Sequence, residues 1–416
     1  MMHRVEALAS VVESRFMSGN RAYLDHNATS VLRPAARDAM VAALDLGGNP
    51  SSVHGEGRNA RRLVEKARAC VASLVGVDSE AVTFTSGATE AANLALTPHI
   101  RNSGVLQPAG ILYVLETEHP CILAGGRFEA EQIKTIPVLE SGLVDFKAFD
   151  QLLNNHQETN GRPYVAVQLV NSETGVIQPV AEIAKKTRFK GGYTLCDAVQ
   201  AVGRIPVDAK ELGVDFMILS AHKIGGPQGV GAFINAHSIL DVSPAIRGGS
   251  QETNRRAGTE NVAAISGFGA AAVEAASDIT KYSKITGLRD SIIEQLTPIC
   301  AGNGLADGLV VFGADAERVG NTLLFGLSGL KAETALIAFD LDGVAVSSGS
   351  ACSSGKVGTS HVLEAMGADA NMARGAIRIS LGWNSTQEDA DKFIVSFKRV
   401  TKRLSEMTKA KLSGAA

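Results

Sequence analysis

The sequence predicts an α/β protein with a mostly parallel sheet between helices, followed by a smaller α+β unit. Helix-like and strand-like segments alternate between about residues 60 and 235, the strands are short runs rich in Val, Ile and Leu, and the pattern changes after Gly258. Such runs are typical of strands that are buried on both faces between helices. Ligands on such sheets bind beyond the carboxyl ends of the strands, so polar residues at those ends are the first candidates for a site.

The alternating region starts with a helical period at residues 61–74, a short strand at 81–85 and a helix at 88–96. Each later strand is a short apolar run of the length typical of buried strands. These later strands are expected at residues 111–116, 164–170, 193–196, 216–220 and 231–234.

The rest of the chain predicts a second unit, in which helices and strands are grouped rather than alternating. We expect residues 24–276 to form the large unit, and residues 1–23 together with 277–416 to form the small one. The elements after Gly258 are expected as helices at 261–276 and 285–296, strands at 309–312, 322–325 and 377–381, and an amphipathic helix from about residue 387.

Composition and charge indicate an ordinary globular protein. The 416 residues are 45% hydrophobic and 20% charged, and 40 Lys and Arg oppose 43 Asp and Glu, which gives a formal charge of −3. This balance predicts neither a nucleic-acid partner nor binding to an anionic membrane. No apolar run is long enough to suggest a membrane span, and Glu6 and Glu13 argue against a mitochondrial transit peptide. The five cysteines are scattered and include no CxxC pair, so a soluble protein in the reducing cytoplasm is expected.

The first polar strand end is the segment VTFTSGATE at residues 82–90. A strand there runs through a Ser/Gly/Thr turn into a helix, whose free backbone N–H groups and positive dipole end can hold a phosphate. Ser86 and Thr89 add hydroxyl groups to this cradle. An ordinary helix N-cap with Glu90 in the first turn explains the same pattern, and this segment alone does not decide between the two.

Two further strand ends carry opposite charges. Asp197 ends an apolar strand, where a carboxylate needs a positive partner such as a protonated ring nitrogen, unless it simply caps a helix. Lys223 follows the next buried strand, beside His222 and a Gly/Pro loop, and a lysine in a dry pocket is suited to Schiff-base chemistry. One strand–helix–strand unit separates the two residues, so both should emerge at the same edge of the sheet.

An amide and an imidazole complete this edge. Asn171 follows the strand at 164–170, and His119 follows the strand at 111–116. Each of these residues alone is most simply a structural group that hydrogen-bonds in the core. Together with the phosphate cradle, the carboxylate and the lysine, they predict a pyridoxal 5′-phosphate pocket.

Two residues of the second unit point to reactive chemistry. Cys352 lies in the segment VSSGSACSSGKVG at residues 346–358, whose small residues pack poorly, so a mobile loop with a reactive thiol is predicted. Arg378 lies on the expected strand at 377–381 and is suited to a bidentate grip on a substrate carboxylate, with a buried salt bridge as the alternative.

At these residues the sequence resembles the cysteine desulfurases of the NifS and IscS type, which are pyridoxal-phosphate enzymes of fold type I in the class V aminotransferase group. The resemblance runs from about Tyr23 to the C-terminal helix, and its long cysteine loop is similar to the subgroup that serves nitrogen fixation and general iron–sulfur assembly. Gln228 stands where a lysine is common, and the segment before Tyr23 is longer than the family needs. The motifs that carry the resemblance are GNPSSVH, TSGATE, TEH, VNSETG, DAVQ, SAHKIGGPQG, GTEN, SSGSACSSG and RISLG.

The resemblance implies a seven-stranded large-domain sheet and a role for each matching residue. Lys223 carries the cofactor, His119 stacks on its ring and Asp197 pairs with the ring nitrogen. Cys352 becomes a persulfide and a transient ligand of a nascent iron–sulfur cluster, the only metal contact that the family suggests. The other implied contacts are Asn171 and Gln200 near the ring oxygen, Ala88, Thr89, Ser220 and His222 at the phosphate, Thr259 from a partner subunit, and Arg378 with Asn171 at the substrate.

The resemblance also implies an activity and partners. The implied reaction converts L-cysteine to L-alanine and leaves a persulfide, which passes to a scaffold protein of iron–sulfur assembly or to another sulfur acceptor. A homodimer is expected, because pockets of this fold are completed across a two-fold interface. A selenocysteine lyase, an ordinary class V aminotransferase and a scaffold protein without turnover are the alternatives, and the sequence leaves the acceptor pathway open.

Overall fold

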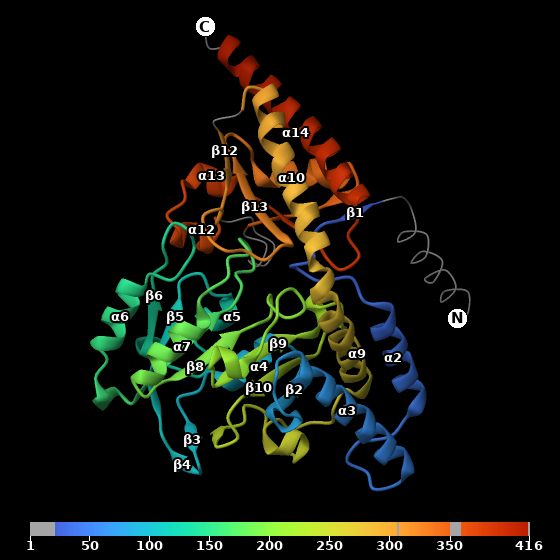
Figure 1. Cartoon of the computed structure of the whole chain (residues 1–416), viewed down its shortest axis with the longest axis vertical. Helices are drawn as coiled ribbons and strands as arrows, with labels where there is room; N and C mark the ends of the chain where they lie inside the picture. The colour runs from blue at the N-terminus through green and yellow to red at the C-terminus, as the bar shows by residue number, and fades with distance from the viewer. Residues whose placement is uncertain (1–20, 306–307, 350–358, 415–416) are drawn as a thin grey trace.

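The structure is a computed structural model that describes residues 21–305, 308–349 and 359–414. Residues 1–20, 306–307, 350–358 and 415–416 lie outside the description, and Cys352 is among them. The chain forms a broad lower unit and a narrower upper unit, from which the C-terminal helix projects (Figure 1).

The lower unit is built on a seven-stranded sheet, which confirms the predicted mixed and mostly parallel architecture. Six of the strands run parallel, and β10 is antiparallel to both of its neighbours. Their order is β2 (Val82–Thr85), β10 (Gly231–Asn235), β9 (Phe216–Ser220), β8 (Tyr193–Asp197), β7 (Arg162–Gln168), β5 (Ala109–Leu115) and β6 (Ile133–Ile136).

Helices cover both faces of this sheet, because alternate side chains of each buried strand point to opposite faces. In β8, Cys196 packs with one hydrophobic cluster, and Leu195 packs with the other. One face is covered by α3 (Gly55–Leu74), α6 (Phe146–Asn154), α7 (Val180–Phe189), α8 (Ala209–Leu212) and α9 (Val262–Asp278), and the other by α4 (Ala88–Ala95) and α5 (Pro120–Leu123). The helix α2 (Pro34–Leu46) packs on α9.

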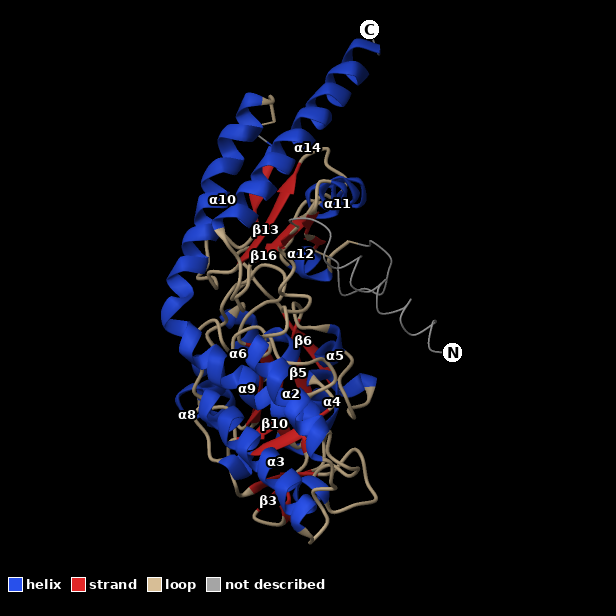
Figure 2. Cartoon of the chain, turned by 90° about the vertical axis from the view of Figure 1, so that its right-hand side faces the viewer, coloured by secondary structure: helices blue, strands red, loops and turns tan. Residues whose placement is uncertain are grey.

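The upper unit is an antiparallel sheet with its own hydrophobic core. Its strand order is β12 (Leu309–Val311), β13 (Thr322–Leu327), β16 (Ile377–Ser380) and β15 (Ser347–Ser348). Its helices are α10 (Tyr282–Gly302), α11 (Ala332–Leu341), α12 (His361–Ala365), α13 (Ala370–Arg374) and α14 (Gln387–Gly414), of which α10 and α14 lie side by side (Figure 2). Ala22 and Leu24 belong to this core, although their position in the sequence is far from the rest of it.

Short elements complete the chain. A two-stranded pair joins β1 (Ala22–Tyr23) to β14 (Val344–Ala345), and a three-stranded sheet joins β3 (Ile100–Asn102), β4 (Val105–Leu106) and β11 (Leu240–Val242). The 3₁₀ turns are η1 (Ser79–Ala81), η2 (Ala130–Gln132), η3 (Glu158–Asn160), η4 (Ala221–Lys223), η5 (Gln251–Asn254) and η6 (Ile279–Lys281). The division of the chain at residues 24 and 276 remains a prediction.

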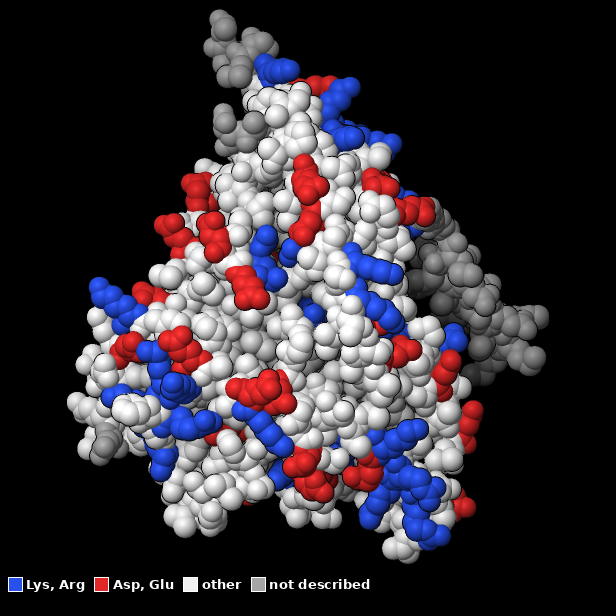
Figure 3. All heavy atoms as spheres, in the orientation of Figure 1, with Lys and Arg blue, Asp and Glu red and all other residues white. Residues whose placement is uncertain are grey.

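One helical run, at residues 262–302, is long and apolar enough to be considered as a membrane span. The run comprises α9, η6 and α10, and its α9 part packs against α2 and α3 in the core. On the face drawn in Figure 3, Lys and Arg side chains are interspersed with Asp and Glu, as the small net charge suggests.

Candidate active site

A cavity of about 590 Å³ opens beyond the carboxyl ends of β7, β8 and β9. It is the place where the parallel strands of the sheet were expected to present a site. Most of the residues singled out from the sequence line it, including residues from the upper unit. The predicted residues that line the cavity are Ser86, Ala88, Thr89, His119, Asp197, Gln200, Ser220, His222, Lys223 and Arg378.

Lys223 lies in the turn η4, directly after β9. Its Nζ donates hydrogen bonds to the carbonyl oxygens of Asn27, at 2.5 Å, and Ala28, at 2.9 Å. The segment that holds these carbonyls follows β1, so the lysine is held by a distant part of the sequence. These two backbone carbonyls therefore help to position the amine at the cavity wall.

Asp197 ends β8 and faces the same cavity. Its Oδ1 accepts a hydrogen bond of 2.9 Å from the backbone N–H of Val199. Burial raises the pKa of the carboxyl to about 6, although the Val199 N–H and Lys223 oppose that shift. A buried carboxylate of this kind favours a cationic partner in the cavity, as a protonated ring nitrogen would provide.

His119 caps the short helix α5, and its Nδ1 accepts a hydrogen bond of 3.2 Å from the backbone N–H of Cys121. Burial, with Lys223 and His361 nearby, lowers the pKa of the imidazole to about 4. The ring is therefore neutral at pH 7, and because Nδ1 is an acceptor, the proton is on Nε2. The Cys121 sulfur lies 3.0 Å from Nδ1 and also lines the cavity.

The start of α4 forms an anion cradle at one end of the cavity. Gly87 occupies the N-cap position without a side-chain cap, and the helix amides that follow it, at Ala88 and Thr89, line the cavity. Ser220 and His222 line the same cavity. Burial, with Lys223 nearby, lowers the pKa of His222 to about 4, so its ring is a neutral hydrogen-bonding group at pH 7. This arrangement suits a phosphate group.

Arg378 reaches the cavity from β16 of the upper unit and is 1% exposed. Its Nη2 lies 2.9 Å from Asp25 Oδ1, and its Nη1 donates to the Ser172 carbonyl at 3.2 Å. Its Nε is buried and has no partner in the described part of the chain. The salt bridge that the sequence offered as the alternative is therefore present, and Arg378 also lines the cavity, while its grip on a substrate carboxylate stays a prediction.

Two predicted residues, Asn171 and Thr259, are not among the residues that line this cavity, and a third is not described. The Asn171 side chain does not line the cavity, because its Oδ1 accepts the backbone N–H groups of Glu173 and Thr174 and so shapes the loop after β7. Thr259 is exposed and lines a separate cavity of about 180 Å³, which shares Ser86 and Gly229 with the main one. Cys352 lies outside the described residues.

The described residues on either side of segment 350–358 contact the site. The Ser360 hydroxyl donates to Glu173 Oε2 at 2.5 Å, and a Cβ at Gly349 would lie 3.2 Å from the same oxygen. His361 Nε2 lies 2.9 Å from the carbonyl oxygen of Glu118, the residue before His119. The described residues that flank segment 350–358 therefore contact the loop after β7 and the residue that precedes His119.

Two residues of the site were not predicted from the sequence. Asn27 accepts hydrogen bonds from Lys223 and Gln200 at its carbonyl, and its side chain donates to Ser172 and Thr322. Glu118 is fully buried, and burial together with Asp197 raises the pKa of its carboxyl. Glu118 lies in the TEH motif, and Asn27 lies close to Tyr23, where the resemblance begins. Only the fold brings these two residues close to Lys223 and Asp197.

The comparison with protein families matches the aminotransferase class-V model to residues 22–393. The chain is 36% identical over 397 residues to the cysteine desulfurase IscS of Dictyoglomus turgidum, with 92% of this chain and 95% of that protein covered. It is 35% identical to the human cysteine desulfurase, with 93% of this chain and 83% of that protein covered. The NifS-like protein of Rickettsia africae superposes with a TM-score of 0.81 at 35% identity, over 92% of this chain and 99% of that one. The chain therefore belongs to the aminotransferase class-V family, in the group of the cysteine desulfurases.

Proposed function

We propose that this protein is a pyridoxal-phosphate-dependent cysteine desulfurase, which converts L-cysteine to L-alanine and transfers the sulfur to Cys352 as a persulfide. The observation that carries this proposal is that Lys223, Asp197, His119 and Arg378 line one cavity. Relatives named cysteine desulfurase, and a structural neighbour described as SspA in complex with cysteine at a TM-score of 0.67 and 25% identity, support it.

The residues present fit the proposed cofactor. The amides at the start of α4, with Thr89, Ser220 and His222, would hold the phosphate, and Asp197 would pair with the ring nitrogen. Gln200 and Asn171 are proposed near the ring oxygen, although Asn171 lies behind the cavity wall. When bound, pyridoxal phosphate supplies an electron sink that weakens bonds at the α-carbon of the substrate.

The residues of the chain then have separate tasks. Lys223 anchors the cofactor and afterwards offers its amine as the base that takes the α-proton of L-cysteine. Asp197 keeps the proton on the ring nitrogen, because the charge of its buried carboxylate is stabilised by that proton. The fork of Arg378 binds the substrate carboxylate and so fixes the orientation of the thiol group.

The sulfur is transferred in a balanced exchange. The Cys352 thiolate attacks the substrate sulfur, an S–S bond forms as the C–S bond breaks, and the electron pair of the C–S bond goes to the carbon skeleton that leaves as alanine. No external oxidant is required. His119 is neutral and carries its proton on Nε2, so it can exchange a proton with a thiol at the cavity.

The proposed partners follow from the same chemistry. The persulfide on Cys352 would pass to a scaffold protein of iron–sulfur assembly or to another sulfur acceptor, and Cys352 would briefly contact the nascent cluster.

We propose a homodimer in the cytoplasm, in which Thr259 reaches the phosphate site of the partner. Apolar side chains on α2 support a subunit contact, since Val41 is 51% exposed and Leu44 is 70% exposed.

The test is turnover of L-cysteine by the protein loaded with pyridoxal phosphate, in the presence of a thiol reductant. Alanine and sulfide should form in equal amounts, and Cys352→Ala should abolish both. Cys121→Ala is the matched control, because it removes a thiol that lines the cavity and should leave turnover intact. Sulfide release that survives in Cys352→Ala would refute the assigned nucleophile, and amino transfer to a keto acid would favour an aminotransferase.

A further inference from the structure

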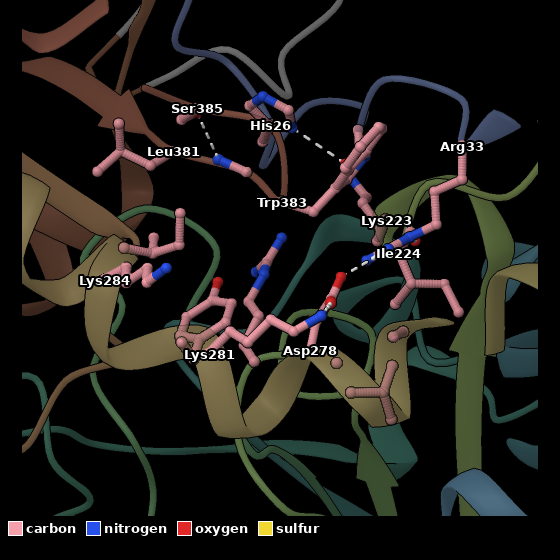
Figure 4. Close-up of a pocket in the computed structure, with 18 of the residues that line it drawn as sticks. His26, Arg33, Lys223, Ile224, Asp278, Lys281, Lys284, Leu381, Trp383 and Ser385 are labelled. Atoms are coloured by element: carbon pink, nitrogen blue, oxygen red, sulfur yellow. Dashed lines mark hydrogen bonds and ion pairs between the residues drawn. The ribbon is translucent and has the colours of Figure 1, made fainter. Parts of the chain in front are cut away.

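A second cavity, of about 250 Å³, lies where α9, α10 and the segment after β16 meet (Figure 4). In that view His26 and Trp383 lie along one side of it, and Asp278 and Lys281 lie along the other. Lys223 lines this cavity as well as the larger one. The basic residues that line it are His26, Arg33, Arg204, Lys223, Lys281 and Lys284, and Asp278 is the one acidic residue among the described lining residues.

Arg204 stands out among the buried arginines near the two cavities. Arg33 pairs with Asp278 at 2.7 Å, and Arg378 pairs with Asp25 at 2.9 Å. Arg204 is only 6% exposed, yet it forms no ion pair with any carboxylate in the described ranges. Its Nη1 donates to the carbonyl and to the side-chain oxygen of Gln200, and its Nε and Nη2 have no hydrogen bond to a described residue.

The surroundings of Arg204 increase its need for an anion. Burial lowers the pKa of its guanidinium, Tyr282 opposes this shift, and the positive charge of Arg378 adds to it. The one carboxylate of the cavity, on Asp278, is already bound by Arg33 and by Lys281 at 3.2 Å. A buried charge without a counter-charge is costly, so an anion from solution that binds beside Arg204 would lower this cost.

Neutral groups of the cavity can add hydrogen bonds to such an anion. The Tyr282 hydroxyl has no hydrogen bond to the described chain, and burial raises its pKa, so it remains a neutral donor. Burial, together with the charge of Arg204, lowers the pKa of His26 to about 3, so this ring is neutral as well. The Trp383 ring is held by a hydrogen bond from Nε1 to the Val31 carbonyl and by the Arg33 guanidinium at 5.1 Å from its centroid.

We propose that this second cavity binds a small oxyanion, with two or more negative charges, against Arg204, Tyr282 and Lys284. The cavity is smaller than ordinary sites for drug-sized ligands, so a compact ion such as phosphate or a short dicarboxylate fits its size. The guanidinium fork and the phenol provide directed donors, and the lysines provide excess positive charge. This site is separate from the phosphate cradle at the start of α4, none of whose residues lines the second cavity.

The test is calorimetric titration of the protein loaded with pyridoxal phosphate, so that the cradle in the larger cavity is already filled. Inorganic phosphate is the first probe and succinate is the second, and sodium chloride keeps the ionic strength constant. Saturable binding of one ion per chain is expected for at least one probe. The probe that binds more tightly identifies phosphate or dicarboxylate as the preferred chemistry.

Variants assign the binding to this cavity. Arg204→Met should weaken binding at least about 10-fold, because it removes the buried guanidinium fork. Tyr282→Phe, which removes only a hydroxyl, should weaken it about 3-fold and serves if Arg204→Met does not fold. Lys134→Met, on the edge strand β6, removes the same unit of charge far from the cavity and should leave the affinity unchanged. Absence of saturable binding of both probes, or equal binding by wild type and the two cavity variants, overturns the proposal.

Discussion

At the scale of single residues, the site depends on charges that are buried next to opposite charges or hydrogen-bond donors. Arg378 is the clearest case, because its guanidinium is divided between Asp25, the Ser172 carbonyl and the cavity. Asp25 orients the guanidinium, and the buried Nε leaves part of its donor capacity unused in the described chain. A carboxylate in the cavity could use donors that the protein itself does not satisfy.

This division predicts how Arg378→Lys should act. Lysine keeps a positive charge beside Asp25 but loses the planar fork, so the KM for L-cysteine should rise about 10- to 100-fold, as for the loss of a charged hydrogen bond. The rate with cysteamine, which lacks the carboxylate, should change little. Steady-state kinetics with both amines check this expectation, and Arg374→Lys, an exposed residue of the same segment, is the control. An equal loss on both amines would mean that Arg378 acts through the structure rather than on the substrate.

Residue types at strand ends were predictable from the sequence, but their buried partners were not. Asp197 and Lys223 follow apolar strands that are one unit apart, and the parallel sheet brings both to one cavity. Glu118 could not be predicted, because nothing in its local pattern indicates complete burial with Oε2 unpartnered in the described structure. The second basic cavity was not predicted either, since its residues come from five separate segments of the sequence.

At the scale of elements, the caps of short helices fix the segments around the site. The helix α12 is only five residues long, so its N-cap carries much of its stability. Ser360 accepts the backbone N–H of Leu363 at 3.2 Å and donates to Glu173 at 2.5 Å, and it thereby ties the start of α12 to the loop after β7. Burial raises the pKa of Glu173 to about 7, although Ser360 and Arg378 oppose the shift.

Ser360→Ala should therefore destabilise the protein in a pH-dependent way. Because burial raises the pKa of Glu173 from its ordinary value of 4.5 to about 7, the folded state keeps a proton that the unfolded state loses, and the contribution of this group to stability falls as pH rises from 4.5 to about 7. At about pH 5.5 the substitution should cost about 1 kcal/mol, the usual value of a cap. At about pH 8.5 the cost should reach about 2–3 kcal/mol, because a charge-assisted hydrogen bond to the ionised carboxylate is then lost.

Urea unfolding at both pH values measures this difference. The matched control is Thr359→Ala, which removes the neighbouring exposed hydroxyl and should cost little at either pH. A cost for Ser360→Ala that is the same at both pH values would show that Glu173 does not ionise in the folded protein over this range.

The elements that were predicted well are those with a continuous apolar signal. The strands β7, β8, β9 and β10 were located to within about two residues, since their buried faces leave short runs of Val, Ile and Leu. The edge strand β6 was not predicted, because two of its four residues, Lys134 and Thr135, are exposed and polar. The helix α10 is longer than expected and contains Pro298, and a proline inside a helix weakens the sequence signal.

At the scale of the whole molecule, the larger cavity is assembled from both units. Arg378 comes from the upper sheet, Lys223 comes from the lower sheet, and Asn27 lies between them with hydrogen bonds to Ser172 and Thr322. The change from alternating to grouped helices and strands along the sequence predicts two units. The contact between the units that builds the site is known only from the structure. Completion of the phosphate site by Thr259 of a partner subunit would extend the same principle to the dimer.

That extension can be tested by complementation. If Thr259 acts across the interface, a mixed dimer of a Lys223→Ala chain and a Thr259→Ala chain has one intact site, which combines the lysine of one chain with the threonine of the other. Random pairing produces mixed dimers in half of the molecules, so refolded mixtures should recover about a quarter of the wild-type activity at limiting pyridoxal phosphate. Each variant alone should have low activity at limiting pyridoxal phosphate. Lys223→Ala lacks the amine, and Thr259→Ala loses a charged hydrogen bond that is worth about 10- to 100-fold in cofactor affinity. A mixture no more active than the mean of its parents would place Thr259 in the site of its own chain, where its small cavity shares Ser86 and Gly229 with the large one.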